Sequence, residues 1–400
     1  MNPRDVVITG IGLVSSLGEG PDVHWQKLTT PGLHPVTDSE RFAPYTVHPL
    51  PEIDWNMQIA KRGDQRQMET WQRLGTYAAG LALDDAGIKG DEALCTTMDM
   101  VVAAGGGERD ITVDSDILAA SSARSDHDLL LNEKLTTELR PTLFLAQLSN
   151  LLAGNISIVH KVTGSSRTFM GEEGAGVSAI ETAAARIRSG QSTHMLVGGA
   201  FQTEHPDMLL GYELGGYLHR GPWQPVWARR GSQGGGVVPG SGGAFLVLEQ
   251  REHAEKRGGR IYAQLGPVVS DRARRSNGEL GATLTRLLEQ TGLPDEAPLD
   301  EALLTISGAS GGHAATKAEK SVLDIRAQVV ARGFSTLTGH LKEAQFPFAV
   351  ALAALAIHHK AAYPAFDPAE QPFSGVPEKI LATAIGYHQF EGMALVCAAD

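Results

Sequence analysis

The stretch GAGVSAIETAAARIRSGQSTHMLVGGA, residues 174–200, decides the fold class. Its first part, Gly174 to Ser189, is rich in alanine and predicts a helix. Met195 to Val197 then predicts a short buried strand, which ends at Gly198 and Gly199. A helix that leads directly into a buried strand is typical of α/β proteins, in which helices cover the faces of a sheet.

The same alternation of strands and helices extends in both directions from this stretch. Towards the N-terminus, Val6 to Ile8 predicts a strand, Trp71 to Gly87 an amphipathic helix, and Met98 to Ala104 a second strand. Towards the C-terminus, Ala244 to Leu248 predicts another strand. The sequence therefore predicts an α/β fold around a largely buried parallel sheet.

The pattern of elements occurs twice along the chain. Ile261 to Ala263 opens a second series in the way that the first strand opens the chain, and Met393 to Ala398 closes it. A repeated pattern of this kind indicates repeated structural units. We therefore predict two related α/β halves packed into one body, residues 1–252 and 253–400, with the junction near 254–259.

The composition argues against several classes of protein. With 400 residues, 42% hydrophobic and 20% charged, the chain can bury a large core and is not disordered. A net charge of −12 argues against binding nucleic acid through its phosphates. The same acidity suits an acidic carrier protein poorly, unless a local basic patch does the docking. The only cysteines are Cys95 and Cys397, so neither a disulfide framework nor a thiolate metal site is expected.

The sequence also predicts where the protein resides. The first residues, MNPRDVVITGIGLVSSLG, read as a strand and a turn and lack the layout of a signal peptide. The longest apolar run, Phe348 to Ile357, is flanked by Pro347 and His358 and is far shorter than the roughly 18 residues that span a bilayer. We therefore expect a soluble, cytoplasmic protein.

Three motifs that suggest a bound cofactor or metal have simpler interpretations. Gly105 to Glu108 lacks the spaced glycines of a dinucleotide site, and the glycines between residues 231 and 243 lack the Gly-Lys-Ser/Thr ending of a P-loop. His358 and His359 are adjacent on a helix and point about 100° apart, which prevents joint metal binding. We expect no cofactor and no metal.

Five segments of the chain, in this order, resemble the β-ketoacyl-acyl-carrier-protein synthases of the thiolase superfamily. They are VVITGIGLVSSLG (6–18), PTLFLAQLSNLLAGNISI (141–158), AARIRSGQSTHMLVGGA (184–200), PGSGGAFLVLEQREHAEKRGGRIYAQL (239–265) and TGHLKEA (338–344). The resemblance implies a thiolase-like fold, with two pseudo-repeated α/β halves in a five-layer arrangement. It also implies dimerisation through edge strands that form one sheet across the interface.

In these synthases a cysteine at a helix N-terminus holds the acyl chain, two histidines assist the condensation, and a lysine supports the second histidine. Counting along the matched segments, the cysteine position is Glu173, the first histidine position is Gly308 and the lysine position is Ser335. Only the second histidine is retained, as His340. A carboxylate cannot hold an acyl chain as a thioester, so we expect no catalytic residues.

Glu173 itself has two interpretations. It is either a functional acid or, more simply, a carboxylate at a helix N-terminus that accepts hydrogen bonds from backbone N–H groups. We also hypothesise that His340 pairs with Glu173 across the former active site. The gating loop of the family falls at residues 386–391, where bulky or polar groups replace its flexible glycines.

The resemblance is closest to the chain-length factors of type II polyketide synthases, which pair with an active ketosynthase, shape its acyl tunnel and work with an acyl carrier protein. The product class implied is aromatic or polyene, including aryl polyene. One alternative is a malonyl-carrier decarboxylase that primes synthesis. It is disfavoured because Gly308 supplies no imidazole and an ionised Glu173 would repel the malonate carboxylate. The other alternative is a scaffold protein.

Four arginines are candidates for a patch that docks the carrier, although scattered surface arginines are the simpler interpretation. They are Arg186, Arg188, Arg229 and Arg230.

Overall fold

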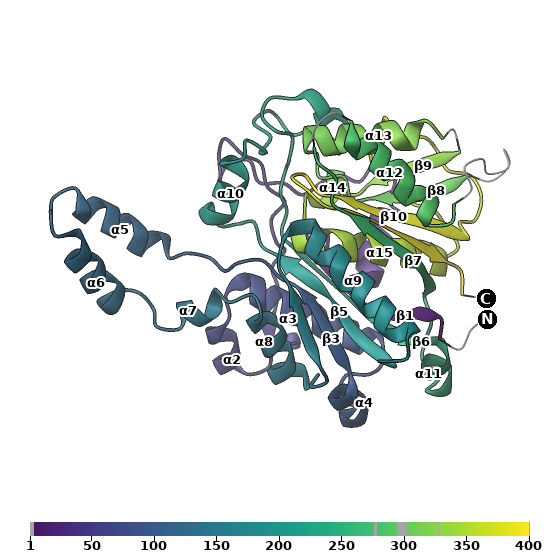
Figure 1. The fold of residues 1–400 in the computed structure, drawn as a ribbon, viewed down its shortest axis with the longest axis horizontal. Helices are drawn as coiled ribbons and strands as arrows, with labels where there is room; N and C mark the ends of the chain where they lie inside the picture. Colours follow the sequence, from purple (N-terminus) through teal and green to yellow (C-terminus); the bar gives the residue numbers. More distant parts are fainter. Residues whose placement is uncertain (1–3, 276–277, 294–301, 327, 400) are drawn as a thin grey trace.

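The strands form one mixed sheet that runs through both halves of the chain (Figure 1). The computed structural model describes residues 4–275, 278–293, 302–326 and 328–399. The strands are β1 (Val6–Ser15), β2 (Gly18–Glu19), β3 (Asp99–Ala103), β4 (Ser166–Phe169), β5 (His194–Phe201), β6 (Gly242–Gln250), β7 (Ala263–Asp271), β8 (Leu303–Ser307), β9 (Val329–Gly333), β10 (Lys379–Ile385) and β11 (Glu391–Cys397).

The strand order shows that the two halves repeat. The sheet runs β4-β3-β5-β6-β1-β7-β11-β10-β8-β9, with β2 paired only to β1. Without β2, each half read from its outer edge inward places its third, second, fourth, fifth and first strands in that order. The pairings match as well: β3–β4 and β8–β9 are parallel, whereas β5–β6 and β10–β11 are antiparallel. The predicted repeat is confirmed, and the predicted largely parallel sheet is wrong, because the sheet is mixed. The division at residues 252 and 253 stays a prediction.

The halves meet where β1 pairs with β7 through Val6 to Ile8. The strand predicted at Ile261 begins two residues later, at Ala263, because it forms its ladder with β1 only from that residue onward. The helices are α1 (Pro21–Leu28), α2 (Arg62–Gln67), α3 (Thr70–Asp85), α4 (Glu92–Thr97), α5 (Ile111–Ser121), α6 (His127–Thr137), α7 (Leu143–Ala146), α8 (Leu151–His160), α9 (Glu172–Arg188), α10 (Pro206–Glu213), α11 (Arg251–Lys256), α12 (Glu279–Gln290), α13 (His313–Asp324), α14 (Ser335–Thr338) and α15 (Gln345–His358), with 3-10 turns η1 (Trp55–Met57), η2 (Val226–Gly231) and η3 (Lys342–Ala344).

Helices and sheet form five layers, because the strands of the first half and those of the second half lie on either side of a central helix layer and each set is covered by outer helices. The helices α9 and α15 lie in the middle, where each contacts strands of both halves. On the outer faces, α3 and α8 cover the first half and α12 and α13 cover the second. The alanines of α9 and α15 are small enough for strands of both halves to approach these helices closely; α15 is buried from Gln345 to Ile357, whereas α9 is buried on one face only. The five-layer fold predicted from the resemblance is confirmed.

The apolar run that contains Phe348 to Ile357 is therefore a core helix. Within the described ranges, no helix is long and apolar enough to cross a membrane.

Close packing between β1 and α3 explains the glycines of the first strand. A Cβ atom at Gly12 would overlap the carbonyl oxygen of Ala78, and one at Gly10 would overlap that of Ala82. Only glycine lets the helix backbone lie directly on the strand. This contact fixes the outer helix layer of the first half.

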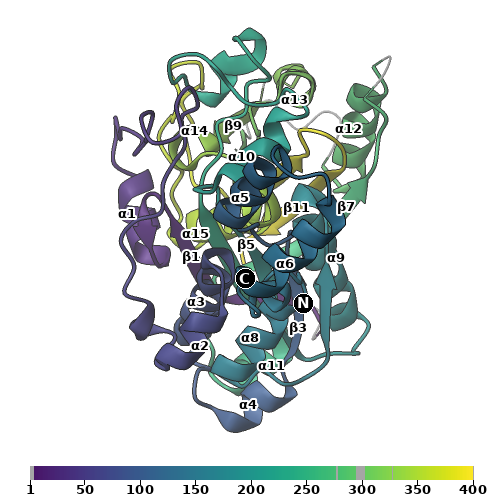
Figure 2. The same ribbon diagram turned by 90° about the vertical axis from the view of Figure 1, so that its left-hand side faces the viewer.

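One segment leaves the body of the molecule. Figure 1 shows α5 and α6 as a helical hairpin that projects away from the sheet, and Figure 2 shows the pair in front of the body; we refer to residues 111–137 as the arm. Only Val113 of α5 and Leu130 of α6 are buried. Large apolar side chains on the arm face solvent, namely Ile111, Leu118, Leu129, Leu131 and Leu135. A hairpin with so little burial in its own chain is typical of an interface element.

Candidate functional site

Glu173 and His340 meet in the core, as hypothesised. Both side chains are fully buried, and Glu173 Oε1 lies 2.7 Å from His340 Nε2. The oxygen lies off the N–H direction, so the contact has ion-pair geometry without an aligned hydrogen bond, and Nε2 has no aligned partner among the described residues. The cysteine position of the resemblance therefore contains a carboxylate held against the one retained histidine.

The position of Glu173 follows from the start of α9. Gly171 precedes the helix with φ 118°, a conformation that favours glycine, and it offers no side chain to cap the first turn. Glu172 and Glu173 then place two carboxylates at the positive end of the helix dipole. The predicted helix-terminal position is confirmed. The donor differs from the simple interpretation, because the N–H that reaches Glu173 Oε1, at 3.1 Å, comes from Tyr387.

The other side of His340 is closed by a tyrosine. The Tyr212 hydroxyl lies 2.8 Å from His340 Nδ1. Burial raises the pKa of Tyr212 well above its ordinary value, so this hydroxyl stays neutral. His340 is thus fixed between a neutral phenol and a carboxylate. In this setting it cannot point both ring nitrogens towards a substrate.

Gln345 fills the space around Gly308, the position that the resemblance assigns to the first histidine. A Cβ atom at Gly308 would lie 2.6 Å from the Thr383 carbonyl oxygen and 3.2 Å from Gln345 Cγ. Gln345 Nε2 donates to the Gly308 carbonyl at 3.1 Å and to Ser335 Oγ at 2.8 Å. A single amide thus connects two of the degenerate positions. The sequence did not identify Gln345, although it stands directly after the matched segment 338–344.

Ser335, at the lysine position, is buried and uncharged. A cation nevertheless lies nearby, because Arg229 is fully buried and its Nη2 donates to the Ser335 carbonyl at 3.5 Å. Burial lowers the pKa of Arg229 to about 9. The prediction that Arg229 contributes to a docking patch on the surface is therefore wrong. Arg186 instead pairs with Asp99 at 2.8 Å, so the proposed four-arginine patch does not form.

The loop that the resemblance identifies as a gate closes over Glu173. Tyr387 Oη donates to Glu172, and the Tyr387 ring lies 5.5 Å from the His340 ring. A Cβ atom at Gly174 would lie 2.7 Å from the Phe390 ring, so this side chain packs against the start of α9. Opening the loop would break these contacts together and would expose a buried ionisable pair.

A small cavity lies beside this site, lined by Trp71, Gly105, Glu108, Lys342 and Glu343 among others. Its volume is about 50 Å³, room for one or two water molecules rather than for an acyl chain. Burial raises the pKa of Glu343, and it raises the pKa of Glu108 to about 7 against the opposing charge of Arg73. Both carboxyls are therefore desolvated groups in the described core.

Comparisons with known proteins identify the family and the fold of the chain. The model of the β-ketoacyl synthase N-terminal domain matches residues 3–254. The 3-oxoacyl-[acyl-carrier-protein] synthase 2 of Vibrio harveyi is 29% identical over 271 residues, which is 66% of this chain and 62% of that protein. The aligned region thus spans less than two thirds of the curated relative's own length.

Two solved structures have the same fold. The ishigamide ketosynthase/chain length factor superimposes with a TM-score of 0.78 at 20% identity, covering 99% of this chain and 100% of that one. A type II polyketide acyl-carrier protein in complex with its ketosynthase gives a TM-score of 0.72 at 18% identity, covering 99% of each chain. At these identities the likeness shows the fold alone.

Proposed function

The chain belongs to the β-ketoacyl synthase family, and from that premise we propose that it is a non-catalytic chain-length factor. In this role it pairs with an active ketosynthase, shapes the acyl tunnel of that partner and works with an acyl carrier protein in type II polyketide biosynthesis. The observation that supports the proposal is the buried contact between Glu173 and His340. A site filled in this way has neither a nucleophile nor space for a substrate.

The pairing face would be the end of the sheet at β4 together with the arm. β4 pairs only with β3 among the described strands and therefore has a free edge, and Ser166 and Arg167 are exposed. Met170, directly after β4, is 69% exposed, and Phe144 of α7, in the same half of the chain, is 67% exposed. Apolar side chains at such exposure, next to an unpaired strand edge, suit a second protein. The arm adds Leu118, which is 71% exposed.

A basic surface for the carrier protein is present on α2 despite the net charge of −12. Lys61, Arg62 and Arg66 are exposed, and none of them has an ion-pair partner in the part of the chain that is described. Arg62 and Arg66 line a surface hollow of about 420 Å³. Figure 1 shows α2 on the same side of the molecule as the arm. We refer to Lys61, Arg62 and Arg66 as the basic patch, which complements an acidic carrier.

Coexpression with the active ketosynthase of the same gene neighbourhood tests the proposal. The two chains should copurify as a heterodimer, and intact-mass analysis of the carrier should show extended chains only when both are present. A stable homodimer that extends chains without a second synthase would contradict it. Incubation with malonyl carrier distinguishes the decarboxylase alternative, because formation of acetyl carrier by this chain alone would favour that enzyme.

A variant of the site gives a second test. Glu173→Cys restores a thiol at the start of α9 but leaves Gly308, Ser335 and Gln345 unchanged. We expect no condensation product from the purified variant, since the imidazole and its supporting cation are still missing. Measurable product from this single change would contradict the proposed loss of chemistry.

A further inference from the structure

The hollow of about 420 Å³ over α2 is lined by a third arginine besides the two of the basic patch. Its lining residues are Asn56 of η1, Arg62, Gln65 and Arg66 of α2, and Arg73 of α3. Three successive elements of the chain thus bring three guanidinium groups to one opening. None of the lining residues is a carboxylate, so the hollow is positively charged.

The acidic side chains of the same segment do not neutralise these arginines. Asp54 accepts hydrogen bonds from the Asn56 N–H at 3.1 Å and from Asn56 Nδ2 at 2.7 Å, and Glu69 pairs with Arg140. Asp64 stands in the first turn of α2 but does not line the hollow. Within the described ranges, none of the three lining arginines forms an ion pair.

Arg73 differs from the other two arginines because it is half-buried and held from two sides. Its Nη2 donates to Thr70 Oγ1 at 3.2 Å, and its guanidinium carbon lies 5.5 Å from the centroid of the Trp55 ring. Burial lowers the pKa of Arg73, and the opposing charge of Glu108 offsets this effect only in part. A desolvated cation of this kind gains from an anion that binds against it.

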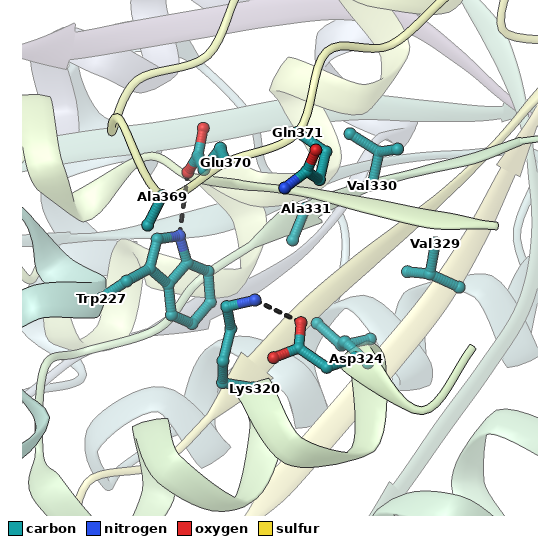
Figure 3. A pocket seen from close by; sticks show the side chains of 10 residues that line it. Trp227, Lys320, Asp324, Val329, Val330, Ala331, Ala369, Glu370 and Gln371 are labelled. Carbon is teal, nitrogen blue, oxygen red and sulfur yellow. Dashed lines mark hydrogen bonds and ion pairs between the residues drawn. The ribbon is translucent and has the colours of Figure 1, made fainter. Parts of the chain in front are cut away.

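The cavity beside β9 shows the opposite balance of charge (Figure 3). Its lining includes two carboxylates, Asp324 and Glu370, and one lysine, Lys320, which already pairs with Asp324. Three donors bind Glu370, namely Trp227 Nε1 at 2.9 Å, the Gly333 N–H at 2.7 Å and the Phe366 N–H at 2.8 Å. The lining of that cavity therefore leaves no cation for an anionic ligand, whereas the hollow over α2 offers three.

The arrangement favours one kind of anion over others. A guanidinium presents two parallel N–H groups, which match two oxygens of a phosphate or a carboxylate. A carboxylate has only two oxygens, so it occupies one such fork, whereas a phosphate group has oxygens in several directions and carries up to two charges. Three arginines around one hollow therefore suit a phosphate group better than a carboxylate.

We propose that this hollow binds a phosphate group. Arg73 contacts the phosphate from the side of α3, where it is held in place, and Arg62 and Arg66 contact it from α2. The site needs neither the ketosynthase nor the carrier, so it does not rest on the proposed chain-length function.

Titration calorimetry of the full chain with sodium phosphate, at an ionic strength kept constant with sodium chloride, tests the site. We expect saturable binding of one phosphate per chain. Sodium acetate under the same conditions should bind at least about tenfold more weakly. Heat that rises without saturation, or equal affinity for acetate, would overturn the proposal.

Variants of Arg73 separate the guanidinium fork from charge alone. Arg73→Gln should weaken phosphate binding at least about tenfold, and Arg73→Lys, which keeps the charge, about fivefold. Arg274→Gln removes an exposed arginine of the second half and should bind phosphate as the unaltered chain does. The proposal is wrong if Arg73→Gln and Arg274→Gln behave alike. If Arg73→Gln does not fold, Arg66→Gln should still weaken binding about threefold, and an unchanged affinity would refute the site.

Carrier binding distinguishes this site from the basic patch. Arg73→Gln should leave carrier binding by the heterodimer within about twofold, because a half-buried guanidinium is reached by a small anion more readily than by a protein. If Arg73→Gln weakens carrier binding as much as it weakens phosphate binding, the hollow is only a part of the carrier surface and the separate phosphate site is wrong. Failure of phosphate binding leaves the copurification test of the chain-length function untouched, so the two proposals can fail separately.

Discussion

The strands β4 and β9 occupy the same place in the two halves, yet one is open and the other is covered. Each is the outermost strand of its half and pairs in parallel with a single neighbour among the described strands. β4 is exposed at Ser166 and Arg167, whereas Arg332 and Gly333 of β9 are buried.

The chain covers β9 with its own residues. Glu370 accepts the outward Gly333 N–H at 2.7 Å, and Arg332 Nε and Nη1 donate to the Tyr363 and Gln371 carbonyls, each at 2.9 Å. Nothing comparable covers β4 in the described chain, where Met170 and the arm leave apolar groups in solvent. A repeated fold thus supplies two equivalent edges, and β4 is the one without a cover among the described residues.

The largest effect is expected on stability, when the carboxylate that covers the edge of β9 is removed. Glu370→Ala removes the acceptor of three buried donors and leaves Arg332 without its carboxylate, which should lower the free energy of unfolding by about 3–5 kcal/mol. Denaturant unfolding of the isolated chain measures this loss. Glu378→Ala, at an exposed position nearby, is the control and should change stability little.

Blocking β4 should have the next largest effect, on pairing rather than on stability. The carbonyls of Ser165 and Phe169 point to β3, so the N–H of Thr168 points to the free edge. Thr168→Pro removes that donor without breaking the ladder with β3 and should weaken heterodimer formation at least a hundredfold, about 3 kcal/mol.

Ala331→Pro is the matched control for Thr168→Pro, because the Ala331 N–H also points outward, but at β9. Analytical ultracentrifugation with the partner should show normal pairing for this variant. If both prolines abolish pairing, or if neither does, the distinction between the edges is wrong.

The buried carboxyl of Glu108, just before the arm in the chain, should make the stability of the protein depend on pH. Glu108 keeps its proton up to about pH 7 in the folded protein, because burial raises its pKa from 4.5. Between these values the unfolded chain binds fewer protons, so the free energy of unfolding falls as the pH rises. Glu108→Gln should therefore be more stable than the unaltered chain by about 2–3 kcal/mol at pH 8 and equal to it at pH 4.

Thermal unfolding across this pH range measures the Glu108 effect, with the exposed Glu52→Gln as the control. A difference in stability between the unaltered chain and Glu108→Gln that stays constant at every pH would contradict the raised pKa of Glu108. Burial also raises the pKa of Glu370 on the covered side, although this carboxyl accepts three hydrogen bonds.

The smallest effect is expected on carrier binding, when the charge of the basic patch is reversed. The double variant Arg62→Glu, Arg66→Glu should weaken carrier binding by the heterodimer about tenfold, and most strongly at low salt. Surface plasmon resonance at two salt concentrations measures this. Arg274→Glu makes the same kind of change on the second half and should have little effect; equal losses would mean that only net charge matters.

The elements with clear periodicity could be predicted from sequence. The helix expected at Gly174 to Ser189 spans Glu172–Arg188, and the strand expected at Met195 to Val197 lies within β5. Strand direction was not predictable, because an apolar run buries itself equally well in a parallel or an antiparallel ladder. The arm was not predicted either, since its exposed leucines have no partner in this chain.

The site was predictable only as far as the resemblance reached. It placed Glu173 opposite His340, and the structure brings them to 2.7 Å. The role of Gln345 has no local signature, because a glutamine that begins a helix is ordinary in sequence and meaningful only through its distant contacts. Arg229 was misplaced on the surface for the same reason, since a sequence does not show that a guanidinium is enclosed by backbone carbonyls.

Gln345 has a consequence for the history of this protein. Its amide links Gly308, Ser335 and the N–H of Leu341, and the resemblance matches the first two to catalytic positions of the active synthases. A mutation that returned a histidine to position 308 would meet the Thr383 carbonyl and this glutamine before it met any substrate. Under the proposed function, regaining catalysis therefore requires several coordinated changes, so the division of labour with an active ketosynthase is expected to be irreversible.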